Sequence, residues 1–419
     1  MASAVSHDAS PRAIGDVIAA ERAALKETGG ITDGSIAANV KPSTPRSPAD
    51  VRPERITSRD VGAFPVINGR EEEWRFTPLE RVRPLLEGAP SQAALQWKSE
   101  LPEGVTLREV ASDDPLLATV PLPVDRLSAL AMSRAPFATI LTVPAEAQLD
   151  EPVVLHLSGT GESDVVWGHV VIEIGRHAKA TVILEHSGDA RYAACVSVLV
   201  GDGAQTDVVS VQEWDRSTLH GQHTGIRVGR DAHVRAMDVT LGGDVVRLVK
   251  TVEYAGPGGD AELFGLYFAD AGQHLEHRLF LDHTAPSCRS RVTYKGALQG
   301  DSAHTVWVGD VLIRAEATGT DTYELNRNLL LTPEARADSV PNLEIETGEI
   351  LGAGHASATG RFDDEQLFYL QARGIPADEA RRMVVRGFFA DVLQQIGVPA
   401  LEERLLAAVE AELERTATR

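Results

Sequence analysis

GRHAKATVI, residues 175–183, opens a pattern that recurs along the chain: a glycine, an alanine three residues later, then a strand-like run. It returns as GDGAQTDVV at 201–209, GRDAHVRAM at 229–237 and GGDAELFGL at 258–266, and after a larger gap as GDSAHTVWV at 300–308. The alanines of the first four copies, Ala178, Ala204, Ala232 and Ala261, are 26, 28 and 29 residues apart. A period in the twenties with a small residue at each turn is typical of stacked solenoid coils. The repeat therefore predicts a mainly β chain coiled as a β-solenoid.

The sequence around this repeat contains strand-like runs and no convincing amphipathic helix from about Val153 to Asp321. Such a stretch is compatible with a large sandwich, a propeller or a solenoid. A two-sheet sandwich remains an alternative, although a sandwich does not require the period. Because a solenoid exposes backbone at both ends, we expect the helical ends of the chain to cap it.

The two ends of the chain differ from the middle. Apolar residues at helical spacing predict a short amphipathic helix over residues 11–26, and the Gly-, Ser-, Pro- and Thr-rich residues 28–54 predict a mobile, partly disordered linker. After His355, helices are expected from about 363 to 373, from 376 to 397 and from 399 onward. We expect an N-terminal helical and linker region at 1–115, a β core at 116–360 and a C-terminal helical domain at 361–419.

Composition argues against several classes of function. The 419 residues carry a formal charge of −21, which disfavours nucleic acid and anionic membranes as partners because phosphates are bound by Lys and Arg. No apolar run is long enough to span a membrane and no secretory signal is visible, so a cytoplasmic protein is expected. Two cysteines are too few for a disulfide scaffold or, alone, for a zinc or cluster site. We expect Cys195 to be buried, Cys288 to lie exposed in a loop, and neither to act as a nucleophile.

A series of motifs in a fixed order runs from the last repeats into the C-terminal helices. NRNLLL lies at 326–331, PNLEIE at 341–346, GHASATG at 354–360, LFYL at 367–370, ARGI at 372–375 and RGFF at 386–389. Together with EEWRFTPL at 72–79, this series resembles the SufB/SufD family, the paired scaffold subunits of the SUF machine that assembles iron–sulfur clusters.

The resemblance implies a right-handed parallel β-helix flanked by helical N- and C-terminal regions. In this family, SufB and SufD pair through the ends of their β-helices, and their C-terminal helices bind SufC, an ATPase of the ABC type. SufB carries the cysteine-centred chemistry, whereas SufD is an accessory subunit linked to iron supply. No phosphate-binding loop occurs in this sequence, so the ATP must be handled by a separate subunit.

Residue 353 distinguishes between the two branches of the family. The segment GAGH at 352–355 has Ala353 where many SufD sequences have a cysteine, and it keeps His355. Because thiolate is a preferred ligand of iron and sulfur, its loss disfavours a SufB-type catalytic scaffold. The resemblance then implies a SufD-like, non-catalytic subunit that pairs with SufB and SufC. An isolated chain could form a homodimer through the same surface.

His355 is the first candidate site residue. By resemblance it faces SufB, where a neutral imidazole can bind iron or transfer a proton. The structural alternative is a histidine satisfied by hydrogen bonds at a solenoid end. No cofactor is expected to bind stably to this chain alone, although iron or a cluster could be shared transiently with SufB.

The resemblance places SufC binding on the C-terminal helices, with Gly374, Met383, Gly387, Phe388 and Phe389 as the candidate contacts. Gly387 lies inside a predicted helix, where glycine costs roughly 1 kcal/mol relative to alanine. This cost suggests close packing at that point, either against the chain's own solenoid or against a partner.

Most of the remaining histidines are interpreted as polar residues on the coil faces, some of them stacked between coils. These are His169, His186, His220, His223, His233, His274, His277, His283 and His304. A rival function is that of a β-helical enzyme acting on polysaccharides, which would need clustered carboxylates that the sequence does not show convincingly. A SufB-type catalytic scaffold is the second rival.

Overall fold

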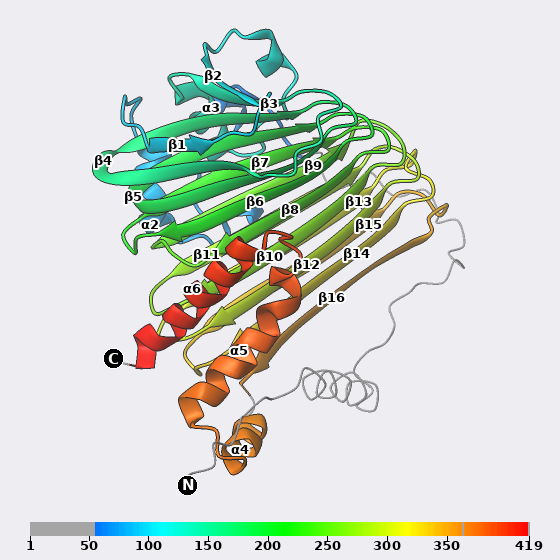
Figure 1. Ribbon diagram of the computed structural model, residues 1–419. Helices are drawn as coiled ribbons and strands as arrows, with labels where there is room; N and C mark the ends of the chain where they lie inside the picture. Colours follow the sequence, from blue (N-terminus) through cyan, green and yellow to red (C-terminus); the bar gives the residue numbers. More distant parts are fainter. Residues whose placement is uncertain (1–54, 363, 418–419) are drawn as a thin grey trace. The chain divides into compact units, whose positions relative to one another are not determined.

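The computed structural model describes residues 55–417 except residue 363 (Figure 1). The helix predicted at 11–26 and the whole of the linker predicted at 28–54 lie outside the described residues. The first described elements are the 3-10 helices η2 (Val61–Ala63), η3 (Glu72–Trp74) and η4 (Pro115–Ala118), the helices α2 (Leu79–Glu87) and α3 (Arg126–Arg134), and the strands β1 (Gln96–Glu100), β2 (Thr106–Val110) and β3 (Ala138–Val143).

The middle of the chain is a parallel β-solenoid, as the repeat predicts. Its strands are β4 (Val153–Ile174), β5 (Lys179–Val200), β6 (Gln205–Trp214), β7 (Leu219–Val228), β8 (His233–Thr240), β9 (Val245–Tyr254), β10 (Asp260–Ala269), β11 (His274–His283), β12 (Arg289–Leu298), β13 (His304–Ile313), β14 (Asp321–Leu330), β15 (Arg336–Ile345) and β16 (Gly352–Arg361). The strand order is β15-β13-β11-β9-β7-β5-β6-β8-β10-β12-β14-β16. The long strand β5 pairs with β6 through residues 179–188 and with β7 through residues 191–200. Beyond β5, odd-numbered and even-numbered strands therefore form two facing sheets.

The repeat forms tight turns at one corner of the solenoid. The amide of Ala178 donates to the carbonyl of Gly175 at 3.1 Å, and Ala204 donates in the same way to Gly201 at 3.0 Å. The residue before each alanine has a left-handed backbone, with φ of +57° at His177 and +67° at Gly203. The alanines are buried because the next coil stacks on them.

Two of the five alanines in the repeat do not belong to this corner. The register aligns the strands that begin at residues 179, 205, 233, 260, 289 and 321, so the corner column after Ala232 continues with Gly259, Cys288 and Thr320. Ala261 is instead paired with Val234 inside a strand. Ala303 precedes β13 on the opposite sheet. Turn lengths differ between coils, so a fixed spacing along the sequence does not identify equivalent positions.

The first coil is capped by strands rather than by the helices that were expected. β3 pairs in parallel with β4, β2 pairs antiparallel with β3, and β1 pairs antiparallel with β4. Helices α2 and α3 instead cover the outer face of the early odd-numbered strands, in a cluster that contains Trp74, Leu85, Leu127, Trp167 and Cys195. At the other end, β15 pairs only with β13 and β16 only with β14 among the described strands. The last coil therefore has two open strand edges.

The chain ends in the helices α4 (Asp364–Ala372), α5 (Ala377–Leu393) and α6 (Pro399–Ala417). Helix α5 follows Pro376 and carries Asp378 and Glu379 in its first turn, a favourable start for a helix. Helices α5 and α6 pack on the outer face of the even-numbered sheet (Figure 1). The side chains of Val385, Phe389 and Leu405 lie in one buried cluster with side chains of β8, β10 and β12. No helix in the described part of the chain is long and apolar enough to cross a membrane.

Candidate functional site at the open end of the solenoid

His355 lies on β16, the last strand, where the solenoid ends. It is aligned with Glu324 on β14, so the two side chains project from the same face of the sheet. This face is the interior one, because Thr322, Glu324 and Asn326 on β14 are all buried, whereas the residues between them are more exposed. His355 itself is exposed because no further coil covers it, and its ring makes no hydrogen bond with the described residues. The imidazole is thus available at the rim.

Glu324, one strand inward from His355, was missed by sequence reasoning. Its side chain is buried, and neither carboxyl oxygen has a hydrogen-bond partner among the described residues. Burial, and secondarily the negative charge of Asp310, raise the pKa of Glu324 to about 8. The carboxyl group is therefore mostly protonated and neutral at pH 7. The available signal was the run of polar residues at the inward positions of β14, where earlier strands carry apolar ones.

Polar side chains continue from this rim into the interior. Asn326 donates to the hydroxyl oxygen of Tyr267 at 2.9 Å, and that hydroxyl donates to Asn328 at 2.8 Å. Asn328 in turn donates to Asn326 at 2.8 Å and to Thr359 on the last strand at 3.3 Å. This network leaves the asparagine side chains satisfied, whereas Glu324 beside it is not. Glu324 is therefore the interior carboxyl that remains free to bind something else.

The donors at the rim are too few for a complete metal site. Among the described residues, no group of three or more His, Cys, Asp or Glu side chains is arranged to hold a metal ion. The rim offers the imidazole of His355 and the carboxyl of Glu324, and Ala353 on the same strand offers no ligand. Any metal bound there would need further ligands from another molecule.

The C-terminal candidate residues divide into exposed and buried ones. Gly374 follows α4 with φ of +87°, a conformation that favours glycine, and Met383 is 43 % exposed. A side chain at Gly387 would meet no atom within 4 Å, so the first of the two alternatives, close packing against the chain's own solenoid, does not occur. Phe388 is half-buried, and the ammonium of Lys295 lies 5.1 Å from the centre of its ring.

The structure corrects the expectation for Phe389. It was expected to face a partner, but its side chain is fully buried in the cluster beneath α5. Val385 and Val392, one turn away on either side, lie in the same cluster, because residues three and four apart share one face of a helix. Phe389 therefore attaches α5 to the chain's own sheet and is not available to a partner.

Both cysteines and many of the histidines are buried. Cys195 is buried as expected, and its thiol donates to the carbonyl of Ser128 at 3.1 Å. The expectation of an exposed Cys288 is wrong: it occupies the buried corner column, and burial raises its pKa. Many histidines lie inside the protein rather than on the coil faces. For example, burial lowers the pKa of His186 and of His277 to about 4, so both are neutral.

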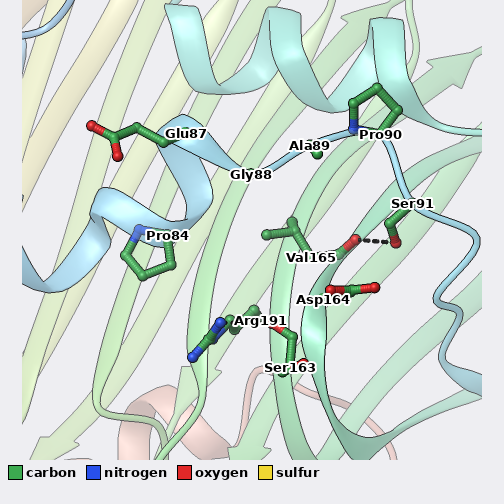
Figure 2. A pocket seen from close by; sticks show the side chains of 10 residues that line it. All are labelled: Pro84, Glu87, Gly88, Ala89, Pro90, Ser91, Ser163, Asp164, Val165 and Arg191. Atoms are coloured by element: carbon green, nitrogen blue, oxygen red, sulfur yellow. Dashed lines mark hydrogen bonds between the residues drawn. The ribbon is translucent and has the colours of Figure 1, made fainter.

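A surface hollow of about 280 Å³ lies at the opposite end of the solenoid, between the end of α2 and the first long strands (Figure 2). In it, the Ser91 hydroxyl donates to the carbonyl of Val165 at 2.8 Å, and the Arg191 guanidinium donates to that of Ser163 at 2.6 Å. These polar groups already serve the fold. No histidine or cysteine lines the hollow, so the last coil remains the candidate site.

Comparison with known proteins places the chain in a family. Residues 156–388 match the family described as SUF system FeS cluster assembly, SufBD core domain. An iron–sulfur cluster assembly SufBD family protein of Mycobacterium tuberculosis is 54 % identical over 371 residues, covering 87 % of this chain and 93 % of the relative. A protein of the same description from Mycobacterium leprae is 50 % identical, covering 87 % and 95 %.

More distant relatives carry a more specific name. The iron–sulfur cluster assembly protein SufD of Bacillus subtilis is 26 % identical over 296 residues, covering 69 % of this chain and 67 % of the relative. SufD of Escherichia coli is 28 % identical over 243 residues, covering 57 % of each. The chain belongs to the SufB/SufD family of iron–sulfur cluster assembly proteins, because the parallel β-solenoid and the ordered motifs of this chain agree with these matches.

Proposed function

We propose that this chain is a SufD-type, non-catalytic scaffold subunit of a cytoplasmic complex that assembles iron–sulfur clusters. It pairs with a SufB-type subunit through its last coil and binds a SufC-type ATPase through its C-terminal helices. The observation that carries the proposal is the open end of the solenoid. There, β15 and β16 each have an unpaired edge, and His355 on β16 is exposed.

The last coil is suited to docking by strand addition. β15 and β16 each present one edge of backbone N–H and C=O groups that no described strand pairs with. Such an edge is a template for pairing with another chain unless it is blocked. The strand β16 contains no proline, and β15 contains one, Pro341. The two edges are held together across the interior, because the hydroxyl of Ser357 on β16 donates to that of Ser339 on β15 at 2.7 Å. A partner with a similar end would continue both sheets.

The ligands at the rim favour an accessory role. His355 and Glu324 supply at most one nitrogen and one carboxyl, and Ala353 supplies no thiol. Iron that passes through this rim would be a cargo, shared with a partner that brings the thiolate and the missing ligands. The relatives named SufD, at 26–28 % identity, support this branch.

The outer surface of the C-terminal helices supports the second contact. Phe368 and Tyr369 on α4 are 72 % and 53 % exposed, and Met383 on α5 is 43 % exposed. The open space at Gly387 would let another backbone approach α5 closely. Large apolar side chains and a bare glycine on the same pair of helices suit a protein partner. They lie on a different element from the rim, so one chain can hold both partners at once.

Co-purification with measured stoichiometry tests both contacts. The full chain is expressed with the SufB-type and SufC-type proteins of the same organism, as wild type and as His355→Ala and Met383→Asp. We expect wild type to recover both proteins, His355→Ala to recover both but to lose iron from the complex, and Met383→Asp to lose the ATPase only. Failure of the wild-type chain to recover either protein, with only homodimers formed through the last coil, would overturn the proposal.

A further inference from the structure

Two histidines face each other on the outer face of the odd-numbered sheet, on the two strands that precede the rim strand β15. His274 is the first residue of β11, His304 is the first residue of β13, and the register pairs them directly. Their Nδ1 atoms are 3.2 Å apart. The two rings are nearly perpendicular, at 73°, with centroids 4.8 Å apart.

A carboxylate holds the far nitrogen of each ring. His274 Nε2 lies 3.1 Å from Glu276, and His304 Nε2 lies 2.7 Å from Asp338. Both carboxylates also accept bonds from arginine: Arg278 donates to Glu276 at 2.6 Å, and Arg336 contacts Asp338 at 2.9 Å. Oxygens that accept from arginine are acceptors for the imidazoles as well. Each imidazole therefore carries its proton on Nε2.

The two rings have too few N–H groups for their three contacts, which are Nδ1 to Nδ1 and each Nε2 to its carboxylate. A neutral imidazole has one N–H, so the pair has two, and both point to the carboxylates. The two Nδ1 atoms then face each other with lone pairs and no hydrogen between them. At 3.2 Å such a contact is unfavourable unless a positive charge lies between the nitrogens. The arrangement of His274 and His304 is complete only with a cation.

The geometry is that of two ligands converging on one ion. Two bonds of about 2.0–2.1 Å, the length of a zinc–imidazole bond, to nitrogens 3.2 Å apart enclose an angle of about 100–105°. The ring centroids, 4.8 Å apart, are only 1.6 Å farther apart than the nitrogens, so the rings are inclined toward a common point rather than arranged in line. A carboxylate on the far nitrogen is the usual support of a metal-binding histidine.

We propose that His274 and His304 bind one divalent transition-metal ion between their Nδ1 atoms, with Glu276 and Asp338 as the supporting carboxylates. The His274 side chain is 2 % exposed and that of His304 is 23 % exposed, so the ion enters on the His304 side and water completes its coordination. Imidazole nitrogen selects zinc, nickel, copper or ferrous iron over magnesium and calcium. This site lies on the opposite sheet from His355, and the chain by itself supplies both histidines and both carboxylates.

Titration of the metal-free full chain with Co²⁺, followed by visible absorption and calorimetry, tests the site. The variants are His304→Ala, Asp338→Asn, and two controls. His233→Ala is the matched control, because His233 is also the first residue of a solenoid strand, β8. Its side chain is 33 % exposed, and its Nδ1 lies 3.5 Å from the carboxylate of Asp260. His355→Ala is the control for the rim.

We expect one Co²⁺ site in the wild type and in both controls, with an absorption band typical of nitrogen ligands. His304→Ala should abolish that band, and Asp338→Asn should weaken binding about 10- to 100-fold, as loss of a supporting carboxylate does. Asp338→Asn leaves both histidines in place, so it remains informative if His304→Ala fails to fold.

Two results would overturn the proposal. One is a Co²⁺ affinity that is unchanged in both Asp338→Asn and a folded His304→Ala, or that is lost only in His355→Ala. The other is a nitrogen-15 NMR signature of an imidazolium proton shared by His274 and His304 that saturating Co²⁺ does not displace. In that case the pair binds a proton and not a metal ion.

Discussion

Glu324 and His355 are direct neighbours in the register of the last two strands of one sheet, yet one is buried and the other is exposed. The difference arises because β14 is covered by the coil above it and β16 is not. The carboxyl group is thereby held uncharged next to an imidazole that meets solvent. This contrast makes the charge of the rim depend on pH through Glu324.

Glu324→Gln should flatten the pH dependence of stability. Burial raises the pKa of Glu324 to about 8 in the folded chain, against 4.5 as its ordinary value. The unfolded chain therefore releases this proton at a lower pH, and stability present below about pH 4.5 is lost as pH rises through about 8. At pH 7 the variant should be more stable by about 3 kcal/mol. Urea unfolding of the chain alone at several pH values measures this, with exposed Glu103→Gln as control. Identical pH slopes in wild type and Glu324→Gln would contradict it.

Cys288 should tolerate only small replacements, because it stands in the same corner column as Ala178, Ala204 and Ala232. Cys288→Ala should change the free energy of unfolding by less than about 1 kcal/mol, whereas Cys288→Leu should cost about 1–3 kcal/mol through overpacking. Thermal unfolding measures both. The buried thiol, with its raised pKa, should also resist a thiol reagent until the chain unfolds. Rapid labelling of the folded protein would refute the placement.

Substitutions at Phe389 and Met383 should separate an effect on stability from an effect on binding of the ATPase. Phe389→Ala removes a fully buried ring and should cost about 3–5 kcal/mol. Met383→Asp changes an exposed side chain and should alter the free energy of unfolding by no more than about 0.5 kcal/mol. Capture of the SufC-type ATPase should fall in the Met383 variant alone once both proteins are compared in folded form. Loss of stability in Met383→Asp equal to that in Phe389→Ala would argue against this division.

Lys295 should hold helix α5 on the sheet. Its ammonium donates to the carbonyl of Phe388 at 2.8 Å and to Asp391 at 2.7 Å, and its side chain is 8 % exposed. Lys295→Met keeps the length of the side chain but removes these bonds, at a cost of about 1–3 kcal/mol. Limited proteolysis should then cut within the C-terminal helices sooner, while Arg386→Met, which changes a 61 % exposed side chain, should not alter the rate. Equal cleavage rates in wild type and Lys295→Met would exclude this role.

Turn chemistry made the solenoid predictable from the sequence. Gly175 and Ala178, with a residue of positive φ between them, form a turn whose residue preferences are local, so the corner is visible without the fold. The C-terminal helices were visible for the same reason, through Pro376 and Pro399 at their starts. Each of these features depends on residues close together in the chain.

Stacking of the coils decided the rest. Whether Ala261 or Gly259 occupies the corner, whether Cys288 is buried, and whether His277 points inward all depend on the register between strands that are 27 to 32 residues apart. A turn longer by one residue moves every following side chain to the other face. The pairings of Glu324 with His355 and of His274 with His304 depend on the same register. The sequence determined that the chain coils and which residues it carries, and only the tertiary structure determined which of them meet.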